Sequence, residues 1–316
     1  MKSIWTIGDI VCEIMRPNHK IGLGVPDFFR GPYASGAPAI FADTVAKLGY
    51  KSGIVGTVGD DAFGHMILKK LQNDGVDCRY IYVHPTLSTG VAFVSYENAD
   101  DRNFIYHLTN SAAGELVLPQ KYPEDIGMIF VNCAAAPDSD KMLKAINEMV
   151  KHCKNHGALF ALDPNMRPEF LKKHTFQEIY GPMLEYCNIL MPGVSELLAL
   201  TGCDNIEHAI ERAFKNSELQ VLVLKKSSKG SVVISRTEKV DVPAYYVPPV
   251  DTTGAGDTFC GGFLGAYMEG LSLKECAEIG SAASAINISA FGPMEGNITM
   301  ENVRQFIKHY TDKGEE

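Results

Sequence analysis

Short apolar segments alternate along the chain with longer segments in which apolar residues recur every three or four positions. The short segments predict core strands over Ser3–Gly8, Ser52–Gly56, Met128–Val131, Leu159–Leu162, Ile189–Met191, Gln220–Leu224 and Ser231–Ile234. The longer segments predict helices over Pro38–Leu48, Phe63–Asn73, Lys141–Asn155, Val194–Thr201, Glu207–Asn216, Leu273–Ala290 and Met300–Tyr310. This alternation favours a three-layer α/β fold, with a mostly parallel sheet covered by helices on both faces, in a single domain over residues 1–316.

Three β-rich segments do not fit the alternation: Asp27–Tyr33, Gly90–Tyr96 and Asn103–His107. No helical pattern separates the last two, and the polar residues 98–101 between them predict a hairpin. We expect a small β-lid, built from about residues 10–33 and 88–108, that projects from the α/β core. At the other end of the chain, residues 312–316 are polar and predict a frayed tail.

Composition argues against several classes of protein. The 316 residues are 46% hydrophobic and 21% charged, as in an ordinary globular domain. The net charge of −9 argues against nucleic acid or an anionic membrane as a partner, although a few local cations can still bind an anion. The eight cysteines are scattered without a C-x-x-C pair, which predicts buried thiols in a reducing compartment rather than a disulfide framework or a zinc site. The N-terminus lacks a secretory signal and no apolar run reaches membrane-spanning length, so we expect a cytoplasmic protein.

The stretch 251–263 reads Asp-Thr-Thr-Gly-Ala-Gly-Asp-Thr-Phe-Cys-Gly-Gly-Phe and carries a small-residue loop into a helix. Glycines allow the backbone to turn sharply, and the first amides of a helix lack partners within it while the helix dipole adds positive charge. The stretch therefore predicts an anion site, with Asp257 in the first helical turn beside the anion. A turn followed by a helix cap explains the same residues about equally well. The acids on both sides of the loop and the glycines inside the helix favour a ligand.

This stretch resembles the second signature of the ribokinase-like (PfkB-type) sugar kinases, in the branch that holds fructokinases, tagatose kinases and 2-keto-3-deoxygluconate kinases. The resemblance extends from Gly8 to Gly292. It implies a ribokinase-like fold and the phosphorylation of a sugar hydroxyl by Mg-ATP. It also implies that Gly254, Ala255 and Gly256 form the anion hole for the transferred phosphoryl group and that Asp257 is the catalytic base.

Two acids, Asp9 and Glu13, come just after the first predicted strand. Ligands of open α/β sheets bind beyond the carboxyl ends of the strands, where acids can accept hydrogen bonds from sugar hydroxyls. From the residues alone, a solvated turn is the alternative. The resemblance implies that the carboxylate at Glu13, where the family usually has Asp, contacts the sugar.

The loop 31–42 is similar to the first family signature, a Gly-Gly-Ala-Pro-Ala-Asn loop that opens a helix, and this similarity implies a substrate contact at Gly36. Ser35 replaces the first glycine and Ile40 replaces the asparagine. Tyr106, near the end of a predicted lid strand, can stack on a sugar and bond it through its hydroxyl, although a single tyrosine is more often a packing residue. Relatives carry an arginine near this tyrosine, where the chain has His107.

Two further segments resemble the same branch. Asp163-Pro164-Asn165-Met166-Arg167 follows a predicted strand, and Arg167 offers a planar donor fork to a phosphate or carboxylate of the substrate, or alternatively to solvent. Pro192-Gly193-Val194-Ser195-Glu196 is similar to an Asn-x-x-Glu box that influences magnesium and phosphate. The similarity implies that Glu196 acts on Mg²⁺ through water, while Gly193 stands where the family has asparagine.

The nucleotide side is implied by a third set of matches. The turn 225–230 is similar to the family's nucleotide turn, which implies ATP contacts by Lys225, Ser227 and Gly230, with Ser227 in place of a glycine. A solvated lysine-rich hairpin is the alternative from the residues alone. Relatives also hold a monovalent cation, K⁺, beside the acid at Asp251 and nearby carbonyls, including that of Thr253.

The leading hypothesis is an ATP-dependent kinase of a ketohexose such as fructose or tagatose. A 2-keto-3-deoxygluconate kinase with Arg167 on the carboxylate is the first alternative, and a nucleoside kinase shares the fold. A sugar or nucleotide sensor with weak turnover is an alternative of another class, against which the retained Asp257 argues. The resemblance and the exposed edges of a lid also suggest a homodimer formed through the lid strands.

Overall fold

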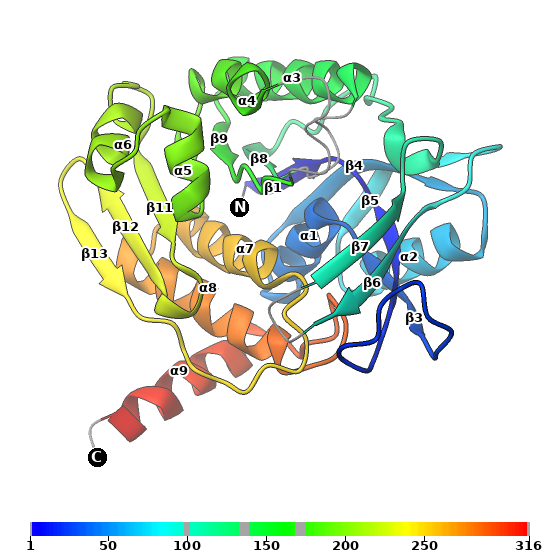
Figure 1. Ribbon diagram of the computed structural model, residues 1–316. Helices are drawn as coiled ribbons and strands as arrows, with labels where there is room; N and C mark the ends of the chain where they lie inside the picture. Colours follow the sequence, from blue (N-terminus) through cyan, green and yellow to red (C-terminus); the bar gives the residue numbers. More distant parts are fainter. Residues whose placement is uncertain (1, 98–101, 133–138, 168–174, 315–316) are drawn as a thin grey trace.

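A nine-stranded sheet runs through the computed structural model, within the residues that the structure describes, 2–97, 102–132, 139–167 and 175–314 (Figure 1). Its order is β13-β12-β11-β10-β9-β8-β1-β4-β5. All neighbouring strands from β11 to β5 are parallel, whereas β12 and β13 are antiparallel to their neighbours. The predicted mostly parallel sheet is therefore confirmed.

The elements follow one another in an α/β order. The strands of the large sheet are β1 (Ser3–Ile7), β4 (Ser52–Gly59), β5 (Asp77–His84), β8 (Ile126–Val131), β9 (Leu159–Leu162), β10 (Ile189–Leu190), β11 (Val221–Lys225), β12 (Ser231–Ser235) and β13 (Lys239–Val242). The helices are α1 (Ala37–Lys47), α2 (Ala62–Asn73), α3 (Asp140–Asn155), α4 (Phe176–Leu184), α5 (Val194–Thr201), α6 (Ile206–Ala213), α7 (Ala255–Met268), α8 (Leu273–Ile288) and α9 (Met300–Gly314). None of the helices in the described residues combines the length and the apolar character that crossing a bilayer requires.

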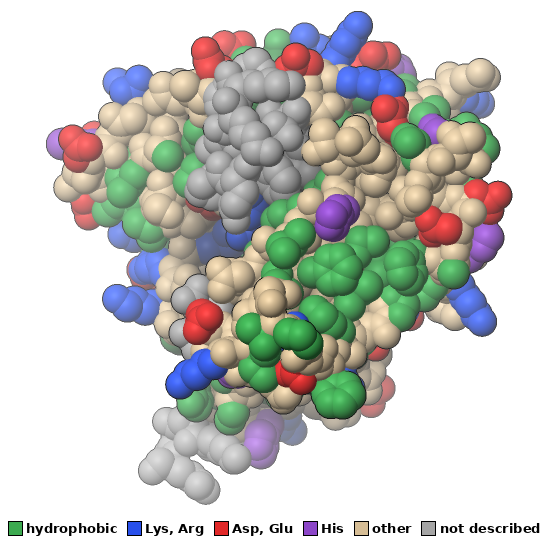
Figure 2. Space-filling view, turned by 45° about the vertical axis from the view of Figure 1, so that its right-hand side comes forward, with side chains coloured by type: hydrophobic (Ala, Val, Ile, Leu, Met, Phe, Trp, Pro, Cys, Tyr) green, Lys and Arg blue, Asp and Glu red, His purple; other side chains and the backbone are tan. Residues whose placement is uncertain are grey.

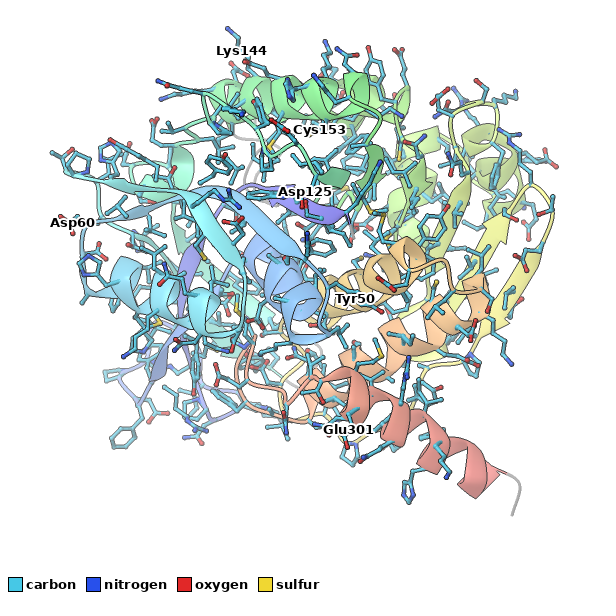
Figure 3. The ribbon with its side chains drawn as sticks, turned by 180° about the vertical axis from the view of Figure 1, so that it is seen from behind. Tyr50, Asp60, Asp125, Lys144, Cys153 and Glu301 are labelled. Atoms are coloured by element: carbon cyan, nitrogen blue, oxygen red, sulfur yellow. The ribbon has the colours of Figure 1, made fainter. Side chains whose placement is uncertain are left out.

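Both faces of the large sheet are apolar, because successive side chains of a strand point to opposite faces. Trp5 of β1 packs in one core cluster with side chains of α3, α4 and α5, whereas Ile4 packs in another with side chains of α1, α7 and α8. The view from behind shows how α3 covers its face: Cys153 points to the sheet and Lys144 points away (Figure 3). The sheet is thus the middle layer of an α/β/α arrangement.

A second, four-stranded sheet stands beside the core in the order β3-β2-β6-β7. Its strands are β2 (Val11–Met15), β3 (Arg30–Ser35), β6 (Gly90–Tyr96) and β7 (Arg102–His107). It comes from the two segments expected to form a lid, and β6 and β7 pair antiparallel as expected. The turn predicted between them, at residues 98–101, lies outside the described residues. We call this sheet the lid.

The structure corrects several sequence-based expectations. Glu13 lies inside strand β2 of the lid and is buried, which excludes the alternative of a solvated turn. The pattern also missed β5, an edge strand whose side chains are mostly half-buried, and α4, whose interior contains Pro182. Helix α9 continues to Gly314, so residues 312–314 are helical rather than frayed. The prediction was weakest where an element lies at the edge of the sheet or contains a residue that usually ends a helix.

Replacing Phe130 of β8 by alanine should destabilise the fold strongly. Phe130 is fully buried, and its ring lies 4.1 Å from that of Phe41 in α1, centroid to centroid. Phe130→Ala removes this contact and leaves a cavity, so the free energy of unfolding should fall by about 3–5 kcal/mol. Urea unfolding measures the loss. Val117→Ala, at a side chain that is 44% exposed, is the control and should change stability by less than about 0.5 kcal/mol.

Candidate active site

A cavity of about 790 Å³ lies between the lid and the carboxyl ends of the core strands. It brings together almost all the predicted site residues: Asp9, Glu13, Gly36, Tyr106, Arg167, Lys225, Ser227, Gly230, Thr253, Gly254, Ala255, Gly256 and Asp257. Glu196 and Asp251 are the exceptions, since they do not line its wall. The cavity therefore joins the expected substrate residues and the expected nucleotide residues in one space.

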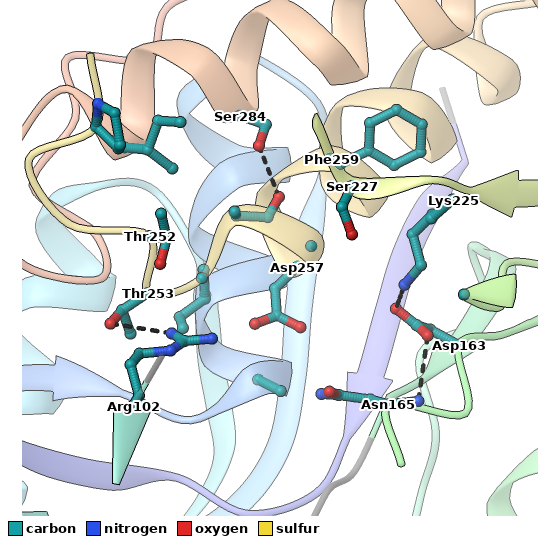
Figure 4. Close-up of a pocket in the computed structure, with 18 of the residues that line it drawn as sticks. Arg102, Asp163, Asn165, Lys225, Ser227, Thr252, Thr253, Asp257, Phe259 and Ser284 are labelled. Atoms are coloured by element: carbon teal, nitrogen blue, oxygen red, sulfur yellow. Dashed lines mark hydrogen bonds and ion pairs between the residues drawn. The ribbon is translucent and has the colours of Figure 1, made fainter. Parts of the chain in front are cut away.

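The start of α7 forms one wall of this cavity (Figure 4). Gly254 precedes the helix in the left-handed conformation, with φ of 75°, which glycine adopts without strain. The Ser284 hydroxyl of α8 donates to the carbonyl of Ala255 at 2.9 Å and holds the first turn in place. Lys225 Nζ lies 3.9 Å from where a Cβ on Gly256 would stand. A helix N-terminus and an ammonium group thus meet at one point, which suits a phosphate.

Asp257 lies in the first turn of α7, and Figure 4 shows its carboxylate directed into the space between Arg102 and Asn165. Its Oδ1 accepts a hydrogen bond of 2.8 Å from Nδ2 of Asn132, which directly follows β8. Burial, reinforced by the charge of Asp163, raises the pKa of Asp257 to about 7, although Lys225 favours the charged form. A carboxylate with this pKa is suited to accept a proton near neutral pH.

Asp163, just after β9, ties three elements together beneath Asp257. Its carboxylate forms an ion pair with Lys225 at the end of β11, and its Oδ2 accepts a weak hydrogen bond of 3.4 Å from the thiol of Cys260 in α7. Its Oδ1 accepts from the amide of Asn165 at 3.2 Å. Although burial opposes the charged form, the Asp163 charge raises the pKa of Lys225, so the lysine stays protonated.

Glu196 supports the site from behind the cavity wall. Its Oε2 accepts from the amide of Gly193 and its Oε1 accepts from the amide of Met166, each at 2.6 Å. The first bond caps α5, and the second fixes the loop that carries Arg167. Because a carboxylate oxygen has two lone pairs, each Glu196 oxygen can still accept a bond from an ordered water.

The lid supplies a second wall of the cavity. Side chains alternate along β7, so that Arg102, Phe104 and Tyr106 line the cavity while His107 is exposed. The ring of Tyr106 stacks on that of Phe104, with centroids 5.1 Å apart. The expected loss of a lid cation at His107 is therefore offset by Arg102, four residues from the tyrosine.

Glu13 of the lid is buried and interacts electrostatically with Arg102 and Arg167. Burial raises its pKa to about 7, against the opposing effects of the Ser35 hydroxyl and of the Arg102 and Arg167 charges. One of its oxygens, Oε2, is buried without a hydrogen-bond partner within the protein. A buried acceptor in a cavity wall is well suited to a ligand hydroxyl.

In the loops that depart from the family signatures, the residues present fit the local backbone and packing. A Cβ on Gly36 would lie 2.5 Å from the carbonyl oxygen of Asp9, so glycine allows α1 to begin against that segment. Ile40 of α1 packs against Gly254, and its Cγ2 and Cδ1 lie 3.0 and 3.1 Å from where a Cβ on that glycine would stand. Ser227 has a φ of 53°, a conformation that the family's glycine would adopt more easily.

Comparison with known proteins agrees with this geometry. The profile of the pfkB family carbohydrate kinases matches residues 30–300. A fructokinase from Solanum tuberosum is 29% identical over 320 residues, which cover 96% of this chain and 95% of the relative. A 2-dehydro-3-deoxygluconokinase from Bacillus subtilis (strain 168) is 28% identical and covers 86% of each chain. An E. coli protein provisionally assigned as ribokinase II, solved with ATP and Mg²⁺, has a TM-score of 0.90 at 33% identity, over 98% of this chain and 100% of its own.

The chain belongs to the pfkB family of carbohydrate kinases. The predicted family, the ribokinase-like fold and the class of activity, phosphoryl transfer to a carbohydrate, are confirmed. The roles of individual residues in this kinase remain predictions. The cavity brings most of these residues side by side.

Two residues at the site, Asn132 and Arg102, were not among those predicted from the sequence. Asn132 bonds Asp257, and Arg102 lines the cavity. Asn132 follows the predicted strand Met128–Val131, so the rule that ligands bind beyond strand ends could have found it. Arg102 immediately precedes the predicted segment Asn103–His107, and extending the alternation of that strand by one residue would have placed it beside Tyr106. Each of the two residues lies one position beyond a predicted strand, and that position was the signal that could have found it.

The ionisation of Asp257 should control the acidic limb of the pH profile of this kinase. If Asp257 is the base, kcat/KM should fall as the pH drops below about 7, because the raised pKa leaves the carboxyl protonated there. The Asn132 bond favours the charged form, so Asn132→Ala should move this limb to higher pH. Glu13→Gln is the control, since Glu13 has a similar pKa and its removal should leave the limb in place. A wild-type limb near pH 4 would contradict the assignment.

Proposed function

We propose that this pfkB-family kinase transfers the γ-phosphoryl group of ATP to a hydroxyl of a neutral ketohexose such as fructose or tagatose. The observation that carries the proposal is the half-buried Asp257 carboxylate at the N-terminus of α7, in one cavity with the buried lid acceptor Glu13. Acids and a stacking ring such as Tyr106 suit a polyhydroxylated, uncharged ligand. The similarity to a potato fructokinase over nearly the whole chain supports a ketohexose.

In the proposed mechanism, Asp257 positions and deprotonates the attacking hydroxyl. Its Oδ1 is bonded to Asn132, which leaves the second oxygen to accept the proton. The sugar oxygen forms a bond to the γ-phosphorus while the bond between that phosphorus and the oxygen bridging to the β-phosphate breaks, and ADP leaves. Backbone amides of Gly254–Gly256, with Lys225 nearby, stabilise the charge on the transferred group. The lid excludes water and so limits hydrolysis of ATP.

ATP is proposed to lie along the turn at Lys225, Ser227 and Gly230, which lines the same cavity. A Cβ on Gly230 would lie 2.1 Å from the carbonyl of Val242, so the turn requires glycine there. The described residues contain no cluster of three acidic, histidine or cysteine ligands for a metal. This fits Mg²⁺ held mainly by phosphates and water, with Glu196 orienting a water. Bound Mg²⁺ would supply neutralisation of phosphate charge.

A sugar-acid kinase is the second candidate, and a specific observation favours it. Arg102 from the lid and Arg167 from the core both line the cavity and both act electrostatically on Glu13. Two guanidinium groups suit a carboxylate, as in a 2-keto-3-deoxygluconate substrate. The Arg102 guanidinium is already engaged, because its Nη1 donates to the Thr253 hydroxyl at 3.2 Å (Figure 4). This bond uses one of the five guanidinium donors of Arg102, and the similarity to the Solanum tuberosum fructokinase keeps the neutral ketohexose as the leading substrate.

A cytoplasmic location is proposed on the state of the thiols. The seven cysteines in the described residues are free, and five of them are buried. Free thiols are typical of a reducing compartment.

The substrate class is tested by ADP release from Mg-ATP with fructose, tagatose, ribose, 2-keto-3-deoxygluconate and adenosine. We expect the highest kcat/KM with a ketohexose, and Asp257→Asn should lower kcat by roughly 10²- to 10⁴-fold, the usual contribution of a general base. ATP binding by Asp257→Asn, measured by calorimetry, is the control for folding. Turnover confined to the sugar acid and abolished by Arg167→Ala would favour the second candidate. Binding of ATP without turnover on any sugar would favour a sensor.

A homodimer formed through the lid is proposed from its outer face. Phe28 is 81% exposed and Ile105 is 47% exposed, while Phe29 packs edge-on against Phe93, which pairs with Ile105 across β6 and β7. Figure 2 shows hydrophobic side chains gathered on the face of the molecule on which the lid lies. An apolar patch of this kind marks an interaction surface, and a second copy of the chain would cover it.

The lid dimer predicts that charge on this patch separates the subunits. Phe28→Asp together with Ile105→Asp should shift the sedimentation coefficient from dimer to monomer, because each aspartate would be buried unpaired in the interface. Analytical ultracentrifugation measures the shift. Tyr186→Asp, at an exposed position on the core, is the control and should stay dimeric. A wild-type protein that sediments as a monomer at every concentration would refute the dimer.

A further inference from the structure

At the expected cation site, Asp251 and the carbonyl of Thr253 both accept hydrogen bonds from the protein. Oδ1 of Asp251 accepts from the Tyr96 hydroxyl and from the amide of Thr253, each at 2.9 Å. Its Oδ2 accepts from the amide of Gly292 at 2.9 Å. The carboxylate is buried and has a donor on each oxygen. Three hydrogen bonds from the protein thus already stabilise the charge of this buried carboxylate.

Asn287, at the end of α8, contacts the carbonyl of Thr253, which is the second expected K⁺ ligand. Its side chain is fully buried, and its Nδ2 donates to the carbonyl of Thr253 at 3.2 Å and to that of Pro293 at 3.1 Å. A carboxamide NH₂ has two hydrogens, one for each carbonyl. The opposite orientation would place Oδ1 against two carbonyl oxygens with no donor among them, so the hydrogen-bond network determines the orientation.

These two carbonyls belong to the loops on either side of the anion hole. Thr253 directly precedes Gly254, and the carbonyl of Pro293 lies 3.0 Å from where a Cβ on Gly254 would stand. Carbonyl groups that converge repel one another unless a cation or a donor lies between them. The amide of Asn287 supplies that donor, and so it fixes the position of Gly254 at the start of α7.

We propose that Asn287 is a positioning residue that takes the place of a monovalent cation in this enzyme, so that its phosphoryl transfer requires no K⁺. Asn287 acts through the Thr253 and Pro293 carbonyls and does not itself line the substrate cavity. The expected K⁺ ligands Asp251 and Thr253 thus do not fit a cation in this chain. In the test of this proposal, the kcat measurements rest on the proposed kinase function, whereas the melting temperatures do not.

The test compares wild type and Asn287→Asp with K⁺ and with tetramethylammonium as the only monovalent cation, in buffer free of Na⁺. Asn287→Asp keeps the shape of the side chain but replaces the two donor hydrogens by a carboxylate, which creates three oxygen ligands for a cation. Wild-type kcat and melting temperature should be the same in both salts. The variant should lose activity in tetramethylammonium by about 10- to 10²-fold, as expected for a displaced catalytic loop. K⁺ should restore much of that activity and raise the melting temperature.

Asn287→Ala is the second variant and covers the case in which the aspartate does not fold. It should turn over more slowly than wild type, and K⁺ should partly rescue it. Ser289→Ala, which removes an ordinary helix bond to Ala285 at 2.8 Å, is the matched control and should be indifferent to K⁺. K⁺ activation of the wild type, or a K⁺-specific rise in its melting temperature, would overturn the proposal. If no sugar is turned over, the proposed function fails, and the melting temperatures still decide the cation question.

Discussion

The buried carboxylate of Asp163 holds together the three elements on which the active site is built. It joins the loop after β9 to Lys225 of β11 through an ion pair, and it accepts a weak bond from Cys260 of α7. The Asp163 side chain is buried and that of Lys225 is 20% exposed, so removing the lysine would leave a buried carboxylate without its cation, at a cost of up to about 3–5 kcal/mol. The same carboxylate raises the pKa of Asp257. Asp163 therefore links the stability of the site to its proton chemistry.

Local charge, rather than net charge, decides which ligands the cavity can take. The chain carries a net charge of −9, yet Lys225, Arg102 and Arg167 gather around the start of α7. With the helix N-terminus they create a positive potential that an overall acidic protein would not suggest. Such a potential suits phosphates, and Oε2 of Glu13, which is buried without a hydrogen-bond partner within the protein, suits a ligand hydroxyl.

The departures from the family signatures are compensated within the structure. Ile40, in place of asparagine, packs against Gly254 at the anion hole. Gly193, also in place of asparagine, still bonds Glu196 through its amide, because that contact needs only backbone. Ser227 has a φ of 53°, in the left-handed region that a glycine adopts more easily. The residues present at these positions are thus accommodated by the local backbone and packing of this chain.

Local patterns of residues were enough to predict the fold class, the position of most core elements and the segments that surround the cavity. Hydrophobic period and helix-opening glycines are local signals, and they identified the core strands and the stretch that opens α7. The resemblance to the sugar kinase family then assigned Asp257, Glu13 and Arg167 to one predicted active site. Elements at the sheet edge escaped because their side chains are only half-buried and so lack a clear pattern.

The contacts between side chains of distant segments became visible only in the folded chain. The partners of Asp257 and Asp251 are Asn132 and Tyr96, which lie 125 and 155 positions away. Asn287 ends an ordinary small-residue helix in the sequence, and its bonds to two loop carbonyls exist only because α8 packs against the start of α7. Hydrogen bonds and pKa shifts depend on distances of a few ångströms between segments far apart in the chain. No local pattern of residues encodes such distances.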